Sequence, residues 1–163
     1  MENNKPLVSV IMNCYNSDTY LREAIDSVIS QTYKNWEIIF WDNQSTDKSA
    51  EIVKSYDDER IKYFYAPSFT SLYEARNYAI EKANGEYIAF LDCDDKWYNN
   101  KLKEQLKVLE NSEYNLCYSN FYNLYENKLK KAFSSLQPSG NIFKYQIANY
   151  SIGILTVMLR KSA

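Results

Sequence analysis

The chain has 163 residues, the usual length of one domain; 45% of them are apolar and 25% charged, which is a globular and not a disordered composition. Its 19 basic and 21 acidic residues leave a net charge of −2, which argues against a protein that binds nucleic acid. Histidine is absent and glycine occurs only three times, so imidazole catalysis, His-ligated zinc and glycine-rich phosphate loops are excluded.

The first half of the chain alternates short apolar runs with amphipathic segments. Residues 7–12 and 36–41 are apolar and rich in β-formers, which predicts two buried strands. A polar segment follows each of them, at 13–18 and 42–47, and each leads into a helix. The apolar face of the first helix is predicted from residues at helical spacing: Leu21, Ala24, Ile25, Val28 and Ile29.

The second half continues this alternation. A strand is predicted at 61–65, and Ser71 with Glu74 forms a capping-box signature for a helix that runs to about Asn84, with Gly85 as its C′ residue. A strand, a helix, a strand, a hairpin or edge region, and a strand-like apolar run are then predicted at 87–91, 102–109, 116–118, 121–133 and 152–159.

Alternating strands and helices predict an α/β fold, with a mostly parallel central sheet and helices on both faces. Ligands of such sheets bind beyond the carboxyl ends of the strands. Three polar loops follow predicted strands, at 13–18, 42–47 and 92–95. We therefore expect these loops to meet along one rim of the sheet.

The third loop carries three acids, Asp92, Asp94 and Asp95, directly after an apolar strand. Carboxylates crowded at a buried edge repel one another unless a cation or a proton offsets their charge. Mg²⁺ or Mn²⁺ would supply that charge and would take oxygen ligands from carboxylates and substrate phosphates. The alternative is a solvated turn with a helix N-cap, which Asp also favours, but the place after a buried strand favours the metal.

Other residues of the rim allow two interpretations each. Asp42 is either a turn residue or an acceptor for a nucleobase N–H or ribose hydroxyl, and Tyr15 is either packed or a stacking face for a base. Arg76 is either solvated, ion-paired or a phosphate contact.

Taken together, these segments resemble family 2 glycosyltransferases, which have the GT-A fold. The resemblance covers roughly residues 6–120, and its order and spacing make it highly specific although each stretch alone is only moderately so. In the second loop, Asn43 and Gln44 stand where the family often has Asp-Gly, which leaves the exact turn open. The matching stretches are 6–16, 36–47, 74–80 and 85–97.

The resemblance implies a metal-dependent, mainly inverting transfer of sugar from a nucleotide-diphosphate donor, commonly UDP-linked, to an acceptor hydroxyl. It implies that Tyr15 stacks on the base, Asp42 hydrogen-bonds the base, Asp92 contacts the ribose, and Asp94 ligates Mn²⁺ or Mg²⁺ beside Asp95. The implied donor-binding set is Asn13, Tyr15, Asp42, Arg76, Asp92 and Asp94.

The end of the chain differs in charge from the rest. Glu126 is the last acid, and residues 127–163 carry six basic groups. We expect a single domain at 1–163 with its donor-binding core at 6–120, and 121–163 as the start of an incomplete acceptor side. The general base is expected beyond Ala163, so that this chain would be a fragment; the alternative is a complete short protein.

The expected acceptor is a carbohydrate or a lipid-linked sugar, as in polysaccharide synthesis. No apolar run approaches the roughly 18 residues of a membrane-spanning helix, and no signal peptide is recognised. Three separated cysteines indicate a reduced, cytoplasmic protein. The basic C-terminal part would either meet an anionic membrane at its inner face or form a solvated hairpin, and the second is favoured.

Two alternatives to an active transferase remain. One is a non-catalytic nucleotide-sugar-binding module or inactive fragment, which the missing base favours. The other is a phosphotransferase with an Asp-x-Asp nucleophile, which is disfavoured because that motif normally follows the first strand, and here the first strand ends in Asn13 and Cys14.

Overall fold

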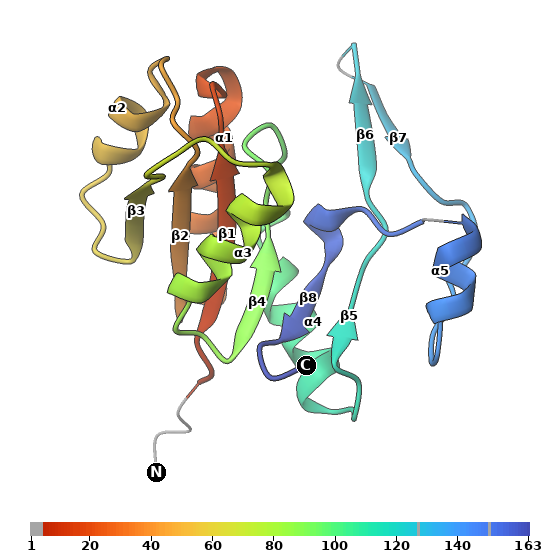
Figure 1. The fold of residues 1–163 in the computed structure, drawn as a ribbon. Coiled ribbons are helices and arrows are strands. Elements are labelled where there is room, and N and C mark those ends of the chain that lie inside the picture. Colours follow the sequence, from red (N-terminus) through yellow and green to blue (C-terminus); the bar gives the residue numbers. More distant parts are fainter. Residues whose placement is uncertain (1–4, 127, 150) are drawn as a thin grey trace.

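The structure is a computed structural model that describes residues 5–126, 128–149 and 151–163. Its centre is a six-stranded sheet in the order β3-β2-β1-β4-β8-β5, with a separate two-stranded hairpin, β6-β7 (Figure 1). The strands are β1 Val8–Cys14, β2 Trp36–Asp42, β3 Ile61–Tyr65, β4 Tyr87–Phe90, β5 Leu116–Cys117, β6 Tyr122–Tyr125, β7 Lys128–Lys131 and β8 Met158–Arg160. The helices are α1 Asp18–Ile29, α2 Ser49–Lys54, α3 Leu72–Lys82, α4 Lys101–Glu110, α5 Phe143–Asn149 and the 3₁₀ turn η1 Ile154–Thr156.

The first four strands form the parallel part of the sheet. β1 is central and pairs in parallel with β2 and β4, while β3 pairs in parallel with β2. The last strand, β8, lies between β4 and β5 and is antiparallel to both. The predicted mostly parallel α/β sheet is therefore confirmed, and the apolar run near the end of the chain supplies the one antiparallel strand.

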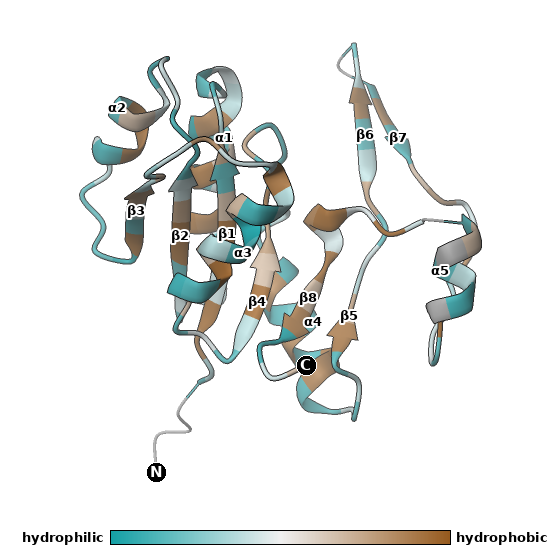
Figure 2. Ribbon diagram, viewed as in Figure 1, coloured by the Kyte–Doolittle hydropathy of each residue, from teal (hydrophilic) through white to brown (hydrophobic). Residues whose placement is uncertain are grey.

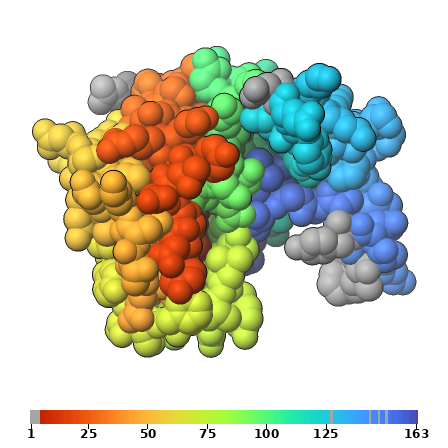
Figure 3. Space-filling model, turned by 90° about the horizontal axis from the view of Figure 1, so that it is seen from above, coloured from red at the N-terminus to blue at the C-terminus, as the bar shows by residue number. Residues whose placement is uncertain are grey.

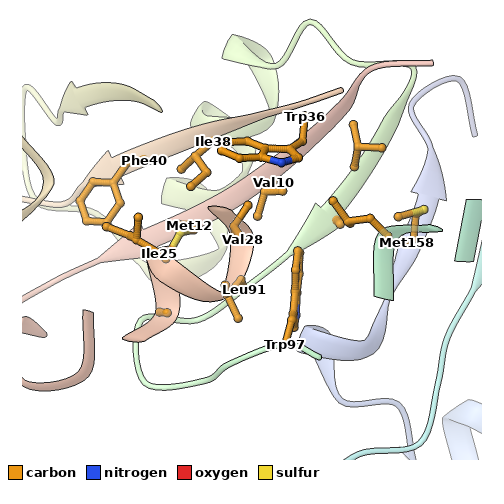
Figure 4. Close-up of a cluster of buried hydrophobic side chains, with 14 of the residues drawn as sticks. Val10, Met12, Ile25, Val28, Trp36, Ile38, Phe40, Leu91, Trp97 and Met158 are labelled. Carbon is orange, nitrogen blue, oxygen red and sulfur yellow. The ribbon is translucent and has the colours of Figure 1, made fainter. Parts of the chain in front are cut away.

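The core lies in two layers, one on each face of the sheet. Alternate residues of β1 point to opposite faces, as the period of a strand requires: Val10 packs towards α1 and α4, and Ile11 packs towards α3. On the first face Trp36 and Trp97 lie in one cluster with α1 side chains (Figure 4). The apolar residues concentrate in the strands, whereas most of the connecting loops are hydrophilic (Figure 2). Helices on both faces are thus explained by strands that are apolar on both sides.

The α3 helix begins as predicted and ends differently. The Ser71 hydroxyl accepts the Glu74 backbone N–H, and the Glu74 carboxylate accepts the Ser71 N–H in return, which completes the capping box. The prediction of Gly85 as a C′ glycine was wrong: the cap residue Ala83 is extended, and Gly85 is not among the residues with positive φ. A Cβ on Gly85 would lie 2.6 Å from the Leu7 carbonyl oxygen, so the glycine permits close contact with the start of β1.

Gly85→Ala is therefore expected to lower the free energy of unfolding by about 2 kcal/mol, because backbone atoms have to move away from the added methyl group. Urea unfolding would measure this change. Gly153→Ala is the control: its Cβ would meet only flexible side chains, the nearest atom being 3.3 Å away on Leu155, and its φ of −72° suits alanine. Equal losses in both variants would contradict the explanation.

Past β5 the chain leaves the sheet and returns as β8. The predicted hairpin is confirmed by β6 and β7, which rise beside the core on the side to which the parallel strands point (Figure 1). Among the described residues, no helix has the length and apolar character needed to cross a bilayer.

Candidate functional site

The three polar loops do meet at the carboxyl ends of β1, β2 and β4, and we call this edge the rim. The backbone links the first two loops, since Asn43 N–H donates to the Cys14 carbonyl oxygen over 2.8 Å. Side chains add further links: Asn16 Oδ1 accepts the Thr46 N–H over 2.7 Å, and Asp47 Oδ2 accepts the Asp18 N–H over 3.0 Å. The rim is therefore a set of loops that hold one another in place.

A hollow of about 430 Å³ opens at the rim, and we call it the rim hollow. Figure 3 views the molecule from above, onto the rim side of the sheet. Four of the predicted site residues line the hollow together: Asn13, Tyr15, Asp92 and Asp94. The remaining lining residues come from the starts of α1 and α3 and from the acidic loop: Ser17, Thr19, Tyr20, Leu72 and Cys93.

The side chain of Asn13 lies in the wall of the rim hollow without a partner. Both its Oδ1 and its Nδ2 atoms are buried, and no hydrogen-bond partner exists for either among the residues that the structure describes. An amide left in this state costs free energy, because its hydrogen bonds to water are lost on burial. A polar ligand in the hollow would be able to supply the missing partner.

Arg76 and Asp92 form an ion pair, which is one of the states expected of this arginine; its contact with a phosphate stays a prediction. Arg76 Nη2 lies 2.7 Å from Asp92 Oδ1, and the two side chains are 22% and 35% exposed. The arginine is not among the residues that line the hollow. The guanidinium of Arg76 therefore holds the Asp92 carboxylate in its orientation without itself lining the hollow.

The other two acids of the loop differ in exposure. Asp94 is exposed at the hollow, while Asp95 is partly buried next to it. Burial, reinforced by the negative charges of Asp94 and Asp92, raises the pKa of Asp95 to about 6. A cation at this loop would relieve that repulsion, so the carboxylates suit an oxygen-preferring divalent ion.

The protein does not offer a complete set of metal ligands by itself. In the described part of the chain, no group of three or more His, Cys, Asp or Glu side chains is arranged to hold a metal ion. Such a set is not needed for Mg²⁺, which commonly binds through one or two carboxylates together with substrate phosphates. Binding of a divalent ion at the acidic loop would therefore require a phosphate-bearing ligand as well.

Asp42 lies beneath the rim hollow and does not line it. Its side chain is wholly buried; Oδ1 accepts the Ser45 N–H over 2.7 Å and Oδ2 accepts the Tyr63 hydroxyl over 2.6 Å. The observed contacts of this carboxylate thus shape the second loop. A hydrogen bond from a nucleobase to the Asp42 carboxylate would be a further contact, and it stays a prediction.

The turn of the second loop places a residue other than glycine in an unusual backbone conformation. Gln44 adopts a φ of 70°, in the left-handed region that glycine favours. The side-chain amide of Gln44 reaches the Ala66 carbonyl oxygen over 3.4 Å. The loop therefore tolerates Asn-Gln at the Asp-Gly position, at the cost of some backbone strain.

Sequence reasoning missed two aromatic residues at the rim: Tyr20, which lines the rim hollow, and Phe69. Phe69 is 58% exposed and packs edge-on against Tyr15, with ring centroids 4.8 Å apart. No local pattern marks Phe69, because it lies in the irregular segment between β3 and α3. The contact depends on how the chain returns to the rim, which the fold decides.

Comparison with known proteins identifies the family. Residues 9–162 match the sequence pattern of the family described as "Glycosyl transferase family 2", so the chain belongs to this family of transferases. It is 35% identical over 161 residues to the putative teichuronic acid biosynthesis glycosyltransferase TuaG of Bacillus subtilis, covering 98% of this chain and 64% of TuaG. It is 35% identical to WfgD of Escherichia coli, a UDP-Glc:α-D-GlcNAc-diphosphoundecaprenol β-1,3-glucosyltransferase, covering 96% of this chain and 61% of WfgD.

Solved structures show the same fold. Residues 1–349 of Staphylococcus aureus TarS, also solved with UDP and with UDP-GlcNAc, match with a TM-score of 0.80 at 23% identity, over 95% of this chain and 47% of that one. The mannosyltransferase PcManGT of Pyrobaculum calidifontis, in complex with GDP-Man and Mn²⁺, matches with a TM-score of 0.64 at 24% identity, over 70% of this chain and 35% of that one. The chain thus has the GT-A fold and spans somewhat under two thirds of the length of TuaG and WfgD.

Proposed function

We propose that this chain binds the donor in a glycosyltransferase that moves a sugar from a nucleotide diphosphate, UDP in the first place, to an acceptor hydroxyl. The observation that carries the proposal is the shared rim hollow, in which Tyr15, Asn13 and two carboxylates face one space at the carboxyl edge of the sheet. The aromatic face of Tyr15 suits a base, the carboxylate of Asp92 suits ribose hydroxyls, and the carboxylate of Asp94 suits a cation on the diphosphate. The unpaired amide of Asn13 suits a further polar group of the donor.

Each residue has a proposed role. The ring of Tyr15, 51% exposed, stacks on the base, and Asp92 accepts hydrogen bonds from the ribose while Arg76 holds it in place. Asp42 contacts the base through a lone pair that its present partners leave free, or else acts by shaping the loop beside it. Asn13 donates to or accepts from the donor at the floor of the hollow.

Mn²⁺ or Mg²⁺ is the proposed cofactor, held by Asp94 with Asp95 beside it. When bound, such an ion neutralises the negative charge that develops on the departing nucleoside diphosphate. The chain's own contribution is to hold the donor so that the acceptor can approach the anomeric carbon in line.

The proposed reaction is a single displacement with inversion. The acceptor oxygen forms a bond to the anomeric carbon, the bond from that carbon to the diphosphate oxygen breaks, and the nucleoside diphosphate leaves with the electron pair. The acceptor proton passes to a general base, an Asp or Glu. We assign no residue of this chain to that role, because Asp92 is ion-paired and Asp94 is assigned to the cation.

The acceptor is proposed to be a carbohydrate or a lipid-linked sugar. WfgD acts on a diphosphoundecaprenol-linked sugar, as its name states. A transferase with such an acceptor would work in the cytoplasm, at the inner face of the membrane. A non-catalytic donor-binding module is the second candidate, because no residue among those described is assigned as the general base.

Isothermal calorimetry with UDP, GDP and dTDP, each with and without Mn²⁺, tests the donor-binding proposal. We expect UDP to bind most tightly and Mn²⁺ to increase its affinity. Absence of binding to all three nucleotides would refute both candidate functions. Sugar transfer by a protein of the relatives' full length would then separate the transferase from the non-catalytic module.

Tyr15→Ala is expected to weaken UDP binding about tenfold with or without Mn²⁺, since stacking of a base on an aromatic ring contributes about 1–3 kcal/mol. The matched control is Tyr73→Ala, which removes a ring that is 71% exposed on α3 and outside the rim hollow. Calorimetry measures both variants. An unchanged affinity in Tyr15→Ala would show that the base binds elsewhere.

A further inference from the structure

Within the described parts of the chain, β6 and β7 form a sheet of two strands, and no third strand pairs with either edge. Its residues pair as Tyr122 with Lys131, Leu124 with Leu129, and Tyr125 with Lys128. Both leucines are largely exposed, Leu124 at 56% and Leu129 at 60%. A two-stranded hairpin that lacks further packing is marginally stable in water, so this one would gain from a surface that covers it.

Apolar and basic side chains are mixed on both faces of the hairpin. Residues directly opposite each other in a ladder share a face, so one face combines two leucines with a tyrosine and a lysine. The other face combines a tyrosine with two lysines. The members are Tyr122, Leu124, Leu129 and Lys131 on the first face and Asn123, Tyr125, Lys128 and Lys130 on the second. Tyrosine, leucine and lysine are the side chains that a membrane interface accommodates, with apolar bodies inside and polar tips outside.

The charge of this region favours an anionic partner. No described side chain forms an ion pair or hydrogen bond with the amines of Lys128, Lys130 or Lys131. Glu126, beside the hairpin turn, is the last acid of the chain, and residues 127–163 hold six basic residues and no acid. The exposed leucines favour a lipid surface over a nucleic acid, because a nucleic acid would pair with the amines and leave the leucines in water.

The hairpin is held at its base and projects from there. The Asn120 side chain donates to the Phe133 carbonyl over 2.6 Å and accepts the Phe133 N–H over 3.1 Å. The Tyr122 ring lies against the ring of Tyr98, with centroids 6.4 Å apart, in the segment that follows the acidic loop of the rim. The hairpin extends on the side of the sheet to which the parallel strands point (Figure 1). The rim hollow opens at the same ends of those strands, so a surface bound by the hairpin would lie near it.

We propose that the β6-β7 hairpin docks this protein on a bilayer that contains anionic lipids, with its lysines at the headgroups and its leucines and tyrosines in the interface. This proposal deepens the proposed function, because it locates the membrane contact of the transferase. The reason for docking rests on that function, whereas the binding of the hairpin to lipid does not. Vesicle binding and nucleotide binding are separate measurements, so either can fail alone.

Co-sedimentation with vesicles tests the proposal. At low salt the chain is expected to bind vesicles made of phosphatidylcholine and phosphatidylglycerol. It is expected not to bind vesicles made only of phosphatidylcholine. The triple variant Lys128→Gln/Lys130→Gln/Lys131→Gln is expected to bind the anionic vesicles about 100-fold more weakly, since each basic residue near such a surface contributes about fivefold. Its affinity for UDP should be unchanged, which shows that the variant is folded.

The matched control Lys5→Gln/Lys103→Gln/Lys107→Gln makes the same change in net charge at exposed positions outside the hairpin and should bind vesicles like the unmodified chain. Leu124→Ser/Leu129→Ser should weaken binding about tenfold at any salt concentration. The proposal is overturned if the control triple loses as much binding as the hairpin triple, or if no binding occurs at low salt. It is also overturned if gel filtration shows that the hairpin joins two copies of the chain.

Discussion

Asp94→Asn is expected to remove most of the Mn²⁺-dependent gain in UDP affinity, about 100-fold, and to slow sugar transfer about 1000-fold in a protein of the relatives' full length. The carboxylate is the exposed acid of the rim hollow, and the asparagine keeps its shape while removing the charge that would attract the cation. Calorimetry with and without Mn²⁺ measures the first effect, and a transfer assay measures the second. UDP binding without metal should hardly change.

Two further variants make this prediction specific. Asp57→Asn changes an exposed acid far from the rim and should leave both measurements unaltered. Asp42→Ala should weaken UDP binding with and without Mn²⁺, because it acts on the base-side loop and not on the cation. If Asp94→Asn and Asp42→Ala lose the same affinity in both conditions, the proposed division of roles is incorrect.

Glu37→Ala is expected to lower the free energy of unfolding by about 3 kcal/mol, since removal of a buried, fully bonded carboxylate leaves its partners unpaired. Glu37 is 3% exposed; its Oε1 accepts the Ser9 hydroxyl over 2.6 Å and the Asn84 N–H over 2.7 Å. Its Oε2 lies 2.6 Å from the Lys62 amine. The Ser9 hydroxyl in turn accepts the Gly85 N–H over 2.8 Å, so one carboxylate joins β1, β2, β3 and the turn before β4.

The same carboxylate should make stability depend on pH. Burial raises the pKa of Glu37, but the hydrogen bonds from Lys62, Ser9 and Asn84 outweigh it, and the net effect is a lowered pKa. A lowered pKa in the folded state means that this stabilisation is complete above the ordinary glutamate pKa and is lost as the pH falls through the folded value. Urea unfolding between neutral pH and pH about 3 should show this loss in the unmodified chain.

Glu37→Gln should lack that part of the pH dependence, because the amide does not titrate in this range. Glu81→Gln, at an exposed position of α3, is the matched control and should change the unfolding free energy by less than about 0.5 kcal/mol. Lys62→Gln should cost less than Glu37→Ala, since 41% of the lysine side chain is exposed and its charge is well solvated without a partner. An unchanged pH profile in Glu37→Gln would assign the acid sensitivity to other groups.

Much of the fold and of the rim could be predicted because the signals were local. The strands at 8–14 and 36–42 are mostly apolar, and the capping box at Ser71 begins α3 where the pattern indicated. The meeting of the three loops followed from one rule, that parallel strands end at the same edge of a sheet. Tyr15 and Asp94 were therefore expected along one rim of the sheet, and both line the rim hollow.

What could not be predicted depended on residues that are far apart in sequence. The ion pair of Arg76 with Asp92 depends on how α3 crosses the end of β4, which no spacing encodes. The burial of Asp42 depends on Tyr63, a residue of the neighbouring strand. Gly85 looked like a helix cap because it follows a helix, whereas the start of β1 is what requires the glycine there.

The place of β8 affects how this sheet can assemble during synthesis. Met158–Arg160 lie between β4 and β5, so these two strands, which are translated earlier, are joined only after β8 has left the ribosome. Until then β4 has an unpaired outer edge, and such edges favour pairing with other chains. The nascent protein therefore passes through a stage in which its sheet is open beside β4, and the arrival of β8 closes it.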